Sequence, residues 1–409
     1  METGFPGRAK EVLAGVTSAS SGGRSDAILA TLAYWDGDLV EADRLAQLSI
    51  AAGDNEAAIR RIHADIAVLT APWLGVTPSY QHDDQPINRG SVAGEAGWFP
   101  LASTSISIHA QGLRFQLGDT ATRTAEMAEI ALSDYVAAAH MELALSAGAV
   151  ARSFGSSSDI TGSAGVAWRL PIHVKFGLRA QRAPYFETEA SLSQSVMTNT
   201  GVAYGQLDHP RGWLGEAAYQ YQRYPDANSV TGGYAWLLAP LVHSSELSLR
   251  AGYAGSVQTS SSGRFSLTNP NQPFPPGDSR FDITGSYQPY YTPIDLQTHS
   301  AVAALEARLS PVVTFNANGS YAFHATESHP VLLVVTAVSP ATSTVQRFSY
   351  TRTFNPWNAR ASLQLKPVND VRLVASGYWF RTGFYSASAA SVSLVYSFAE
   401  RAIRQAGGY

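Results

Sequence analysis

Ile172-His-Val-Lys-Phe-Gly-Leu-Arg-Ala-Gln181 is the stretch of sequence that decides the fold class of this chain. Apolar residues occupy every second position from Ile172 to Ala180, and the positions between them hold polar or charged residues and one glycine, Gly177. Because successive side chains of a strand point to opposite faces, this alternation predicts an antiparallel β-strand with one apolar and one polar face. The same pattern returns in Leu247–Tyr253, Val313–Phe323, Arg360–Lys366 and Val392–Phe398.

About sixteen such segments lie between Pro72 and Phe398, which leaves about 20 residues for each strand and its share of turn. Strands of transmembrane barrels need about 9–11 residues in the membrane, with short turns on one side and longer loops on the other. The sequence therefore predicts a mainly β fold: a single transmembrane antiparallel β-barrel of about 16 strands over residues 72–398. Tight turns are expected at Leu170-Pro171, Ser310-Pro311 and Lys366–Asp370, and long connections over Ser260–Ser279 and Thr326–Thr344.

The composition narrows the class of protein. Only 15% of the 409 residues are charged, against about 25% in typical soluble domains, although 45% are hydrophobic. With 11% aromatic residues and a net charge of −4, the chain is neither disordered nor a basic nucleic-acid binder. It contains no cysteine, which excludes thiol nucleophiles, disulfides and cysteine-ligated metals.

Period two alone does not say which face meets lipid, because a soluble sandwich alternates in the same way. The membrane is favoured by an apolar face built largely of Ala, Gly, Tyr and Phe, and by a last strand that ends on the aromatic Phe398. Aromatic residues also gather near strand ends, where an interfacial girdle belongs. A soluble or surface-exposed ligand-binding β-protein is the alternative. The predicted girdle residues are Trp98-Phe99, Tyr185-Phe186, Tyr290-Tyr291, Tyr378-Trp379-Phe380 and Phe384-Tyr385.

The chain before residue 72 follows a different period. Ala, Leu and Ile recur at three- and four-residue spacing, which predicts helices over Ala27–Trp35, Leu39–Ala52 and Asn55–Leu69. We therefore divide the chain into an irregular N-terminus (1–25), a helical segment (26–71), the barrel (72–398) and a C-terminal tail (399–409).

The Gly-Asp pairs at Gly37-Asp38 and Gly53-Asp54 are typical of the turns in tetratricopeptide repeats, with an arbitrary helical hairpin as the alternative. Such repeats need about three stacked copies for stability. The first twenty residues also lack the apolar region of an export signal. A truncated gene or a partial reading frame is the expected cause of both features.

Several short motifs share their order and spacing with one known family. They are Arg182-Ala-Pro184 with Ser191-Leu-Ser193, Tyr290-Tyr-Thr-Pro293, Leu365-Lys-Pro-Val-Asn-Asp370, Phe384-Tyr385 and the closing Leu394-Val-Tyr-Ser-Phe398. From about Arg182 onward the chain resembles the outer-membrane exporters of bacterial exopolysaccharide, especially the cellulose synthase operon C-type subunit. The resemblance implies a passive outer-membrane channel for a cellulose-like or other polysaccharide, without a cofactor. It also implies periplasmic helices that contact the polymer or the inner-membrane glycan synthase complex.

If the apolar faces meet lipid, the polar faces line the lumen. Acids, bases and amides are mixed there, whereas a channel for anions is expected to carry a ring of Arg and Lys. This mixture predicts a wall for a neutral glycan. Tyr378 and Phe380 share the face of Arg372, so both an inward position and a girdle position are open for them. The candidate lumen residues are Lys175, Arg179, Gln181, Glu216, Gln220, Glu246, Arg250, Glu306, Arg308, Asn316, Asn318, Arg360, Gln364 and Arg372.

Catalytic motifs are missing from the sequence. It contains no G-x-S-x-G nucleophile elbow, no Gly-rich phosphate loop and no H-x-x-x-H spacing of metal ligands. His82-Asp83-Asp84 could hold a hard cation, but we interpret it as a solvated turn. We therefore predict no enzyme, no metal and no cofactor. A general porin and a barrel enzyme with a Ser-His-acid site stay open as alternatives.

Overall fold

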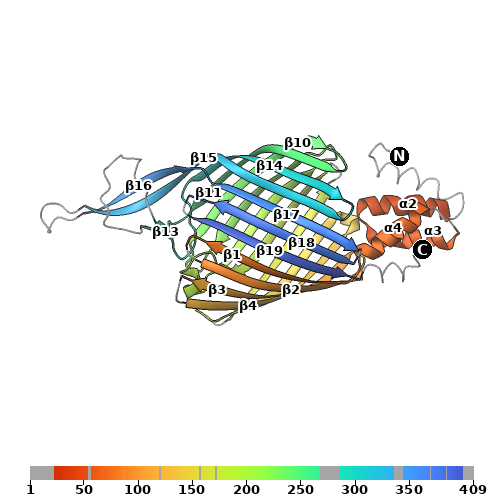
Figure 1. The fold of residues 1–409 in the computed structure, drawn as a ribbon, viewed down its shortest axis with the longest axis horizontal. Helices are drawn as coiled ribbons and strands as arrows, with labels where there is room; N and C mark the ends of the chain where they lie inside the picture. Colours follow the sequence, from red (N-terminus) through yellow and green to blue (C-terminus); the bar gives the residue numbers. More distant parts are fainter. Residues whose placement is uncertain are drawn as a thin grey trace.

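The structure is a computed structural model that describes residues 23–53, 57–85, 87–118, 121–155, 158–170, 173–267, 285–335, 344–368, 370–383 and 385–398. The predicted C-terminal tail and most of the predicted N-terminal segment lie outside these residues. One long sheet dominates this part of the chain, with helices at one end of it (Figure 1). Its strands are β1 (Trp73–Asp83), β2 (Ile87–Leu101), β3 (Thr104–Leu117), β4 (Ala121–Val136), β5 (Met141–Arg152), β6 (Ser158–Leu170), β7 (Val174–Pro184), β8 (Met197–Asp208), β9 (Leu214–Arg223), β10 (Ser229–His243), β11 (Leu247–Ser260), β14 (Leu296–Ser310), β15 (Val313–Val335), β16 (Thr344–Phe354), β17 (Trp357–Val368), β18 (Val371–Arg381) and β19 (Ser386–Ser397).

The sheet closes into a ring. All of its pairings are antiparallel, and the first strand, β1, pairs with the last strand, β19, from Trp73 opposite Ser397 to Asp83 opposite Ala387. The sheet has 17 strands, but β16 is paired only with β15 among the described strands, so 16 strands form the ring. The structure therefore confirms the predicted single antiparallel barrel of about 16 strands.

Strand β15 is longer than the sequence predicts. Its first part, Val313–Tyr321, pairs with β17 inside the ring, and its second part, Ala325–Val335, pairs with β16. This second part and β16 form a hairpin that extends beyond the rim of the barrel (Figure 1). The prediction of a long connection over Thr326–Thr344 is thus wrong up to Val335, because pairing with β16 continues the strand although a polar run, Thr326–His329, and an apolar run, Val331–Val335, replace the alternation.

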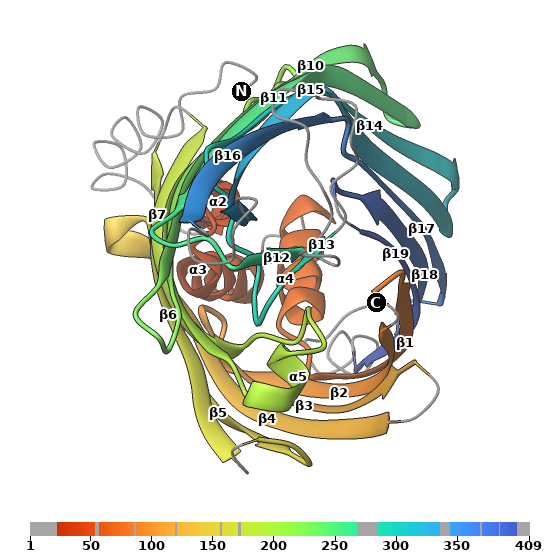
Figure 2. The same ribbon diagram turned by 90° about the vertical axis from the view of Figure 1, so that its left-hand side faces the viewer.

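The connections at the two ends of the barrel differ in length. At the end next to the helices, strands meet in turns of a few residues, such as Ser310–Val313 and Val368–Val371. At the other end, longer segments carry α5 (Ser191–Gln194), β12 (Phe265–Leu267) and β13 (Gly285–Tyr287). Figure 2, viewed from that end, shows these three elements inside the ring of strands. We call this end the loop end and the other the turn end.

The helices α2 (Gly23–Asp36), α3 (Leu39–Ala51) and α4 (Ala57–Leu69) confirm the predicted helices to within a few residues. Gly37 makes the turn between α2 and α3 with a φ of +80°, a conformation that glycine adopts without strain. Asp38 caps α3, because its side chain accepts the backbone N–H of Glu41 at 3.1 Å. Among the described residues, none of the helices combines the length and the apolar character that crossing a membrane requires.

Cross-strand pairing sorts the side chains into two faces, because directly paired residues of an antiparallel sheet lie on the same face. Phe115 identifies the inner face, since it is fully buried and packs with Phe186 and with Leu192 of α5. The opposite face carries large apolar side chains such as Phe176 (52% exposed) and Leu178 (55% exposed). The barrel is therefore apolar on its outside, as a lipid-facing wall must be.

The predicted aromatic girdle is wrong in part. Trp98 and Trp379 are indeed exposed. Phe186 and Tyr290, however, are 8% and 1% exposed and lie among segments that fold into the loop end. Ring chemistry is the same at a membrane interface and in a buried cluster, so the sequence pattern could not separate the two positions. Phe384 lies outside the described residues.

Candidate functional site inside the barrel

The structure places all but one of the predicted lumen residues on the inner face of the strands. Lys175, for example, is opposite Gln206, which is opposite Glu216 on the next strand. Glu246 differs, because it lies in the turn before β11 and is not part of the strand wall. The residues on the inner face are Lys175, Arg179, Gln181, Glu216, Gln220, Arg250, Glu306, Arg308, Asn316, Asn318, Arg360, Gln364 and Arg372.

Several charged side chains of the inner wall form ion pairs with one another. Glu142 lies between two cations, 2.5 Å from Arg169 and 3.2 Å from Lys175. Arg152, whose side chain is fully buried, pairs with Asp159 at 2.7 Å. Sequence reasoning named Lys175 but missed its partners, although the alternation within Met141–Arg152 is a signal that could have placed Glu142 on the polar face. These two parts of the wall therefore carry paired charges.

A row of hydroxyl and amide side chains crosses neighbouring strands from β15 to β2, and we call it the hydroxyl belt. Within it, the hydroxyl groups of Ser376 and Ser391 are 2.7 Å apart, and the Gln111 amide donates to Ser91 from the next strand at 3.3 Å. Hydroxyl groups both donate and accept, as sugar hydroxyls do. Sequence reasoning missed most of this belt, because single serines in alternating strands carry no motif. Its members, in order around the barrel, are Asn316, Ser362, Ser376, Ser391, Ser79 and Ser91.

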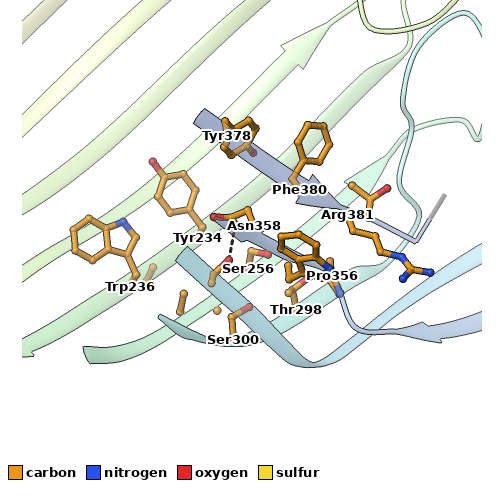
Figure 3. A pocket seen from close by; sticks show the side chains of 16 residues that line it. Tyr234, Trp236, Ser256, Thr298, Ser300, Pro356, Asn358, Tyr378, Phe380 and Arg381 are labelled. Carbon is orange, nitrogen blue, oxygen red and sulfur yellow. Dashed lines mark hydrogen bonds between the residues drawn. The ribbon is translucent and has the colours of Figure 1, made fainter. Parts of the chain in front are cut away.

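Aromatic rings also face the lumen (Figure 3). Tyr378, for which two positions were open, is paired with inner-face Arg360, whose guanidinium carbon lies 5.3 Å from the ring centroid. Phe380 stacks on Tyr378 with 5.2 Å between ring centroids. Figure 3 shows these rings with Tyr234 and Trp236 around a cavity of about 340 Å³. Tyr378 and Phe380 therefore belong to the inner wall and not to a girdle.

Stacked tyrosines occupy the loop end of the lumen. Tyr290, which follows β13, stacks on Tyr224, which follows β9, with 3.5 Å between ring centroids and planes 6° apart. Its hydroxyl donates to the carboxylate of Asp226 at 2.5 Å. Tyr185 packs edge-on against Tyr224 at 6.1 Å, and its hydroxyl accepts the backbone N–H of Tyr291 at 3.2 Å. These contacts join three segments that are far apart in the sequence.

Asp226 anchors this stack in its ionised form. Partial burial raises the pKa of its carboxyl group, but hydrogen bonds from Tyr290 and Asn228 and the charge of Arg264 outweigh that effect, so the net pKa is lowered. Arg264 forms an ion pair with Asp226. The segment that carries Arg264 and Tyr290 is therefore tied to the β9–β10 connection by both charge and stacking.

A small pocket of about 150 Å³ opens beside these tyrosines, and we call it the exit pocket. A Cβ atom at Gly232 would lie only 2.6 Å from Cγ of Gln258, so glycine at this position leaves room for the Gln258 amide. The lining combines aromatic rings with amides and includes no charged side chain. It consists of Tyr185, Gln220, Gln222, Tyr224, Val230, Gly232, Gln258 and Tyr291.

A carboxyl group holds the segment across the loop end in place. We call the described residues Ser261–Leu267 and Gly285–Asp295 the inner loop, because they lie inside the ring in Figure 2. The Tyr287 hydroxyl donates to Oε1 of Glu327 at 2.5 Å, and the Tyr291 hydroxyl donates to the same oxygen at 3.2 Å. Glu327 thus fastens the inner loop to strand β15.

This fastening is sensitive to protonation. Glu327 lies in the part of β15 that pairs with β16, beyond the ring and outside the membrane span. Burial raises the pKa of Glu327 to about 7, against the opposite effects of hydrogen bonds from Tyr287 and Tyr291 and of the Arg352 charge. Burial, together with Arg352, lowers the pKa of neighbouring His329 to about 4. Both side chains therefore favour the attached position of the inner loop, which we call the closed loop, when they are neutral.

The His82-Asp83-Asp84 turn has a structural role. Asp83 is 3% exposed and accepts the backbone N–H of Ile87 at 2.8 Å, so the prediction of a solvated turn is wrong for this residue. Asp84 accepts both the backbone N–H and the hydroxyl of Ser386 at 2.9 Å, which joins the ends of β1 and β19. Within the described ranges, no group of three or more His, Cys, Asp or Glu side chains could hold a metal ion.

Comparisons with known proteins bear on the fold. The chain matches no protein-family model and no curated protein sequence. It is similar in structure to a bacterial polysaccharide outer membrane secretin, with a TM-score of 0.55 and 10% identity over 81% of this chain and 99% of the other. CdiB from Acinetobacter baumannii gives a TM-score of 0.43 at 12% identity over 80% and 60% of the two chains. OpdK from Pseudomonas aeruginosa gives 0.37 at 10% identity over 80% and 98%.

These likenesses concern the fold, since every identity is low. The closed antiparallel ring, its apolar outer face and its polar inner wall are the fold of outer-membrane β-barrel proteins. A soluble β-sandwich does not close one sheet into a ring with large apolar side chains on its outside, so the structure favours the membrane over the soluble alternative.

Proposed function

We propose that the protein is an outer-membrane channel through which a neutral polysaccharide leaves the cell. The exit pocket is the observation that carries this proposal, because tyrosine rings and glutamine amides meet there without a charged side chain. A sugar ring presents C–H faces that pack on aromatic rings and hydroxyl groups that pair with amides. An acidic polymer would instead require cations in the lining to offset its loss of hydration.

The wall below the exit pocket supports the same cargo. A conduit must bind its cargo well enough to admit it, yet weakly enough at each site to release it. The hydroxyl belt offers many exchangeable hydrogen bonds of this kind. Glu142 is paired with both Arg169 and Lys175, so this part of the wall presents no free carboxylate to the cargo.

The helices belong, in this proposal, at the periplasmic entrance. Outer-membrane barrels have their short turns on the periplasmic side, and the helices lie at the turn end (Figure 1). A Cβ atom at Gly37 would lie 3.3 Å from Nη1 of Arg169, so the α2–α3 turn touches the barrel beside the Arg169–Glu142 pair. From there the helices can meet the incoming polymer or the inner-membrane glycan synthase. That they form a tetratricopeptide unit stays a prediction.

The proposal is tested by measuring how oligosaccharides block the current through the channel. We expect a neutral linear glucan oligosaccharide to interrupt the single-channel current in a planar bilayer, and an oligouronate of equal length to do so much less. The substitution Gln222→Leu removes one amide group from the exit pocket and replaces it with an apolar side chain of similar size. Since a hydrogen bond contributes about 0.5–1.5 kcal/mol, the residence time of the neutral oligosaccharide should fall roughly two- to tenfold.

Gln116→Leu is the matched control, because Gln116 is exposed on the outer face of β3, next to inward-facing Phe115. This variant should leave the residence time unchanged. Equal block by the neutral and the acidic oligosaccharide, or no effect of Gln222→Leu, would show that the exit pocket does not select a neutral glycan.

A further inference from the structure

The outer face of strands β5 to β9 is hollowed by a groove of about 520 Å³. Its floor is made of small residues, because Ala164, Ala180 and Gly201 lie opposite one another on β6, β7 and β8. Large apolar side chains flank it on both sides. We call the floor and these flanking side chains together the outer groove. The flanking residues are Leu145 (53% exposed), Leu178 (55%), Tyr219 (57%) and Tyr221 (43%).

Two arginines lie at the loop-end side of the outer groove. Arg182 is opposite Asn199, and Asn199 is opposite Arg223, so the three side chains form one row on the outer face. Each is two positions along its strand from Ala180, Gly201 and Tyr221 respectively, which is about 7 Å and on the same face. The row therefore stands directly above the groove.

Positive charge in this row exceeds what the protein neutralises. Arg182 donates to the carbonyl oxygen of Ile160 at 3.1 Å and lies 3.6 Å from Asp159, with 43% of its side chain exposed. Asp159 is already paired with Arg152 at 2.7 Å. Arg223 is exposed and makes no hydrogen bond or ion pair within the described parts of the chain. An anion at this row would meet two guanidinium groups.

The depth of the row identifies the kind of ligand. The loop end carries the long connections, which in outer-membrane barrels lie outside the cell, so the row falls at the outer-leaflet headgroups and the groove at the acyl chains below. Arginine binds phosphate oxygens through two parallel N–H donors. The apolar groove thus matches the acyl chain of an amphiphile, and the two arginines match its anionic headgroup.

We infer that the outer groove and the Arg182–Arg223 row bind an anionic outer-leaflet lipid, a phosphorylated and acylated glycolipid. One acyl chain lies along the floor formed by Ala164, Ala180 and Gly201. Its phosphate is held between Arg182 and Arg223, and Asn199 supplies an amide between them. This site is separate from the lumen, since all of these side chains are on the opposite face of the strands.

Lipid retention by the full chain tests the site. The protein is equilibrated in nanodiscs of phosphatidylcholine with a minor share of diphosphoryl, hexa-acyl glucosamine-disaccharide lipid, and bound lipid is counted by native mass spectrometry. Wild-type protein should retain one glycolipid. The double variant Arg182→Gln, Arg223→Gln loses two charge-assisted contacts and should retain at least about tenfold less. Faster migration of unboiled protein on a denaturing gel shows that each variant is folded.

Two further variants separate the site from general lipid contact. Gly201→Leu should also lower retention, because a Cβ atom at Gly201 meets nothing within 4 Å and the side chain can fill the groove without disturbing the strand. Arg114→Gln removes an exposed outer-face arginine on β3, away from the groove, and should retain lipid normally.

The ligand controls use the same readout. The dephosphorylated glycolipid should be retained far less than the phosphorylated one, and inorganic phosphate alone should not displace the lipid. Equal retention by the double variant, equal retention of the dephosphorylated lipid, or displacement by inorganic phosphate would overturn the assignment.

Discussion

Replacing Tyr290 with alanine is expected to open the loop end of the barrel and raise the mean conductance of the reconstituted channel. Tyr290 is 1% exposed, stacks on Tyr224 and donates to Asp226, so it is a main attachment of the inner loop. Truncating a buried aromatic side chain costs about 3–5 kcal/mol, which corresponds to a shift of on the order of 100-fold or more towards the detached loop. The measurement is single-channel recording in planar bilayers.

Two variants check that the loop is the cause. Tyr290→Phe keeps the stack on Tyr224 and loses only the hydrogen bond to Asp226, so its conductance should lie between those of the wild type and Tyr290→Ala. Tyr253→Ala removes an exposed ring from the outer face and should change nothing. If folded Tyr290→Ala conducts like the wild type, the inner loop does not limit the opening.

Raising the pH from about 6.5 to 7 is expected to open the channel. Because the pKa of Glu327 is raised in the closed state, this group stabilises the closed loop fully below its ordinary pKa of 4.5 and loses that contribution as the pH rises through about 7. His329 has the opposite sign: its lowered pKa stabilises the closed loop above 6.5, and this contribution is lost as the pH falls through about 4. The closed loop is therefore most stable between these limits, at weakly acidic pH.

Open probability as a function of pH measures this effect. Between about pH 6.5, where the opposing contribution of His329 ends, and about pH 7, ionisation of Glu327 raises the ratio of open to closed channels with a slope of up to about tenfold per pH unit, and the ratio levels off above pH 7. Glu327→Gln keeps an oxygen that accepts from Tyr287 but cannot ionise, so the rise towards pH 7 should disappear. Glu306→Gln, on the inner wall away from the inner loop, should retain it. A rise that survives in Glu327→Gln would assign the titration to another group.

The barrel could be predicted from the sequence because its cause is local. Alternation at period two depends only on neighbouring residues, and it placed Lys175 on the inner face as well as the strands around it. The same local rule misplaced Glu246, because this residue lies in the turn and strand β11 begins only at Leu247. It also could not show that β15 continues to Val335, since the polar run Thr326–His329 and the apolar run Val331–Val335 do not alternate.

The loop end could not be predicted, because its contacts join residues that are distant in the sequence. Tyr290 was expected in a girdle, yet it stacks on Tyr224 from another connection. Glu327 gives no sequence signal at all, and its role depends on Tyr287 reaching it from the inner loop. Contacts between connections that are distant in the sequence depend on how their side chains pack, and a short sequence motif does not predict this packing.

Polymer passage is the most direct test of the proposed channel. The chain is reconstituted into liposomes that enclose a mixture of a labelled neutral linear glucan and a labelled polyuronate of equal length, and the release of each is followed above pH 7, where Glu327 is ionised. We predict that the glucan is released through the barrel while the polyuronate is retained. Retention of both polymers, or release of both at equal rates, would contradict a conduit for a neutral polysaccharide.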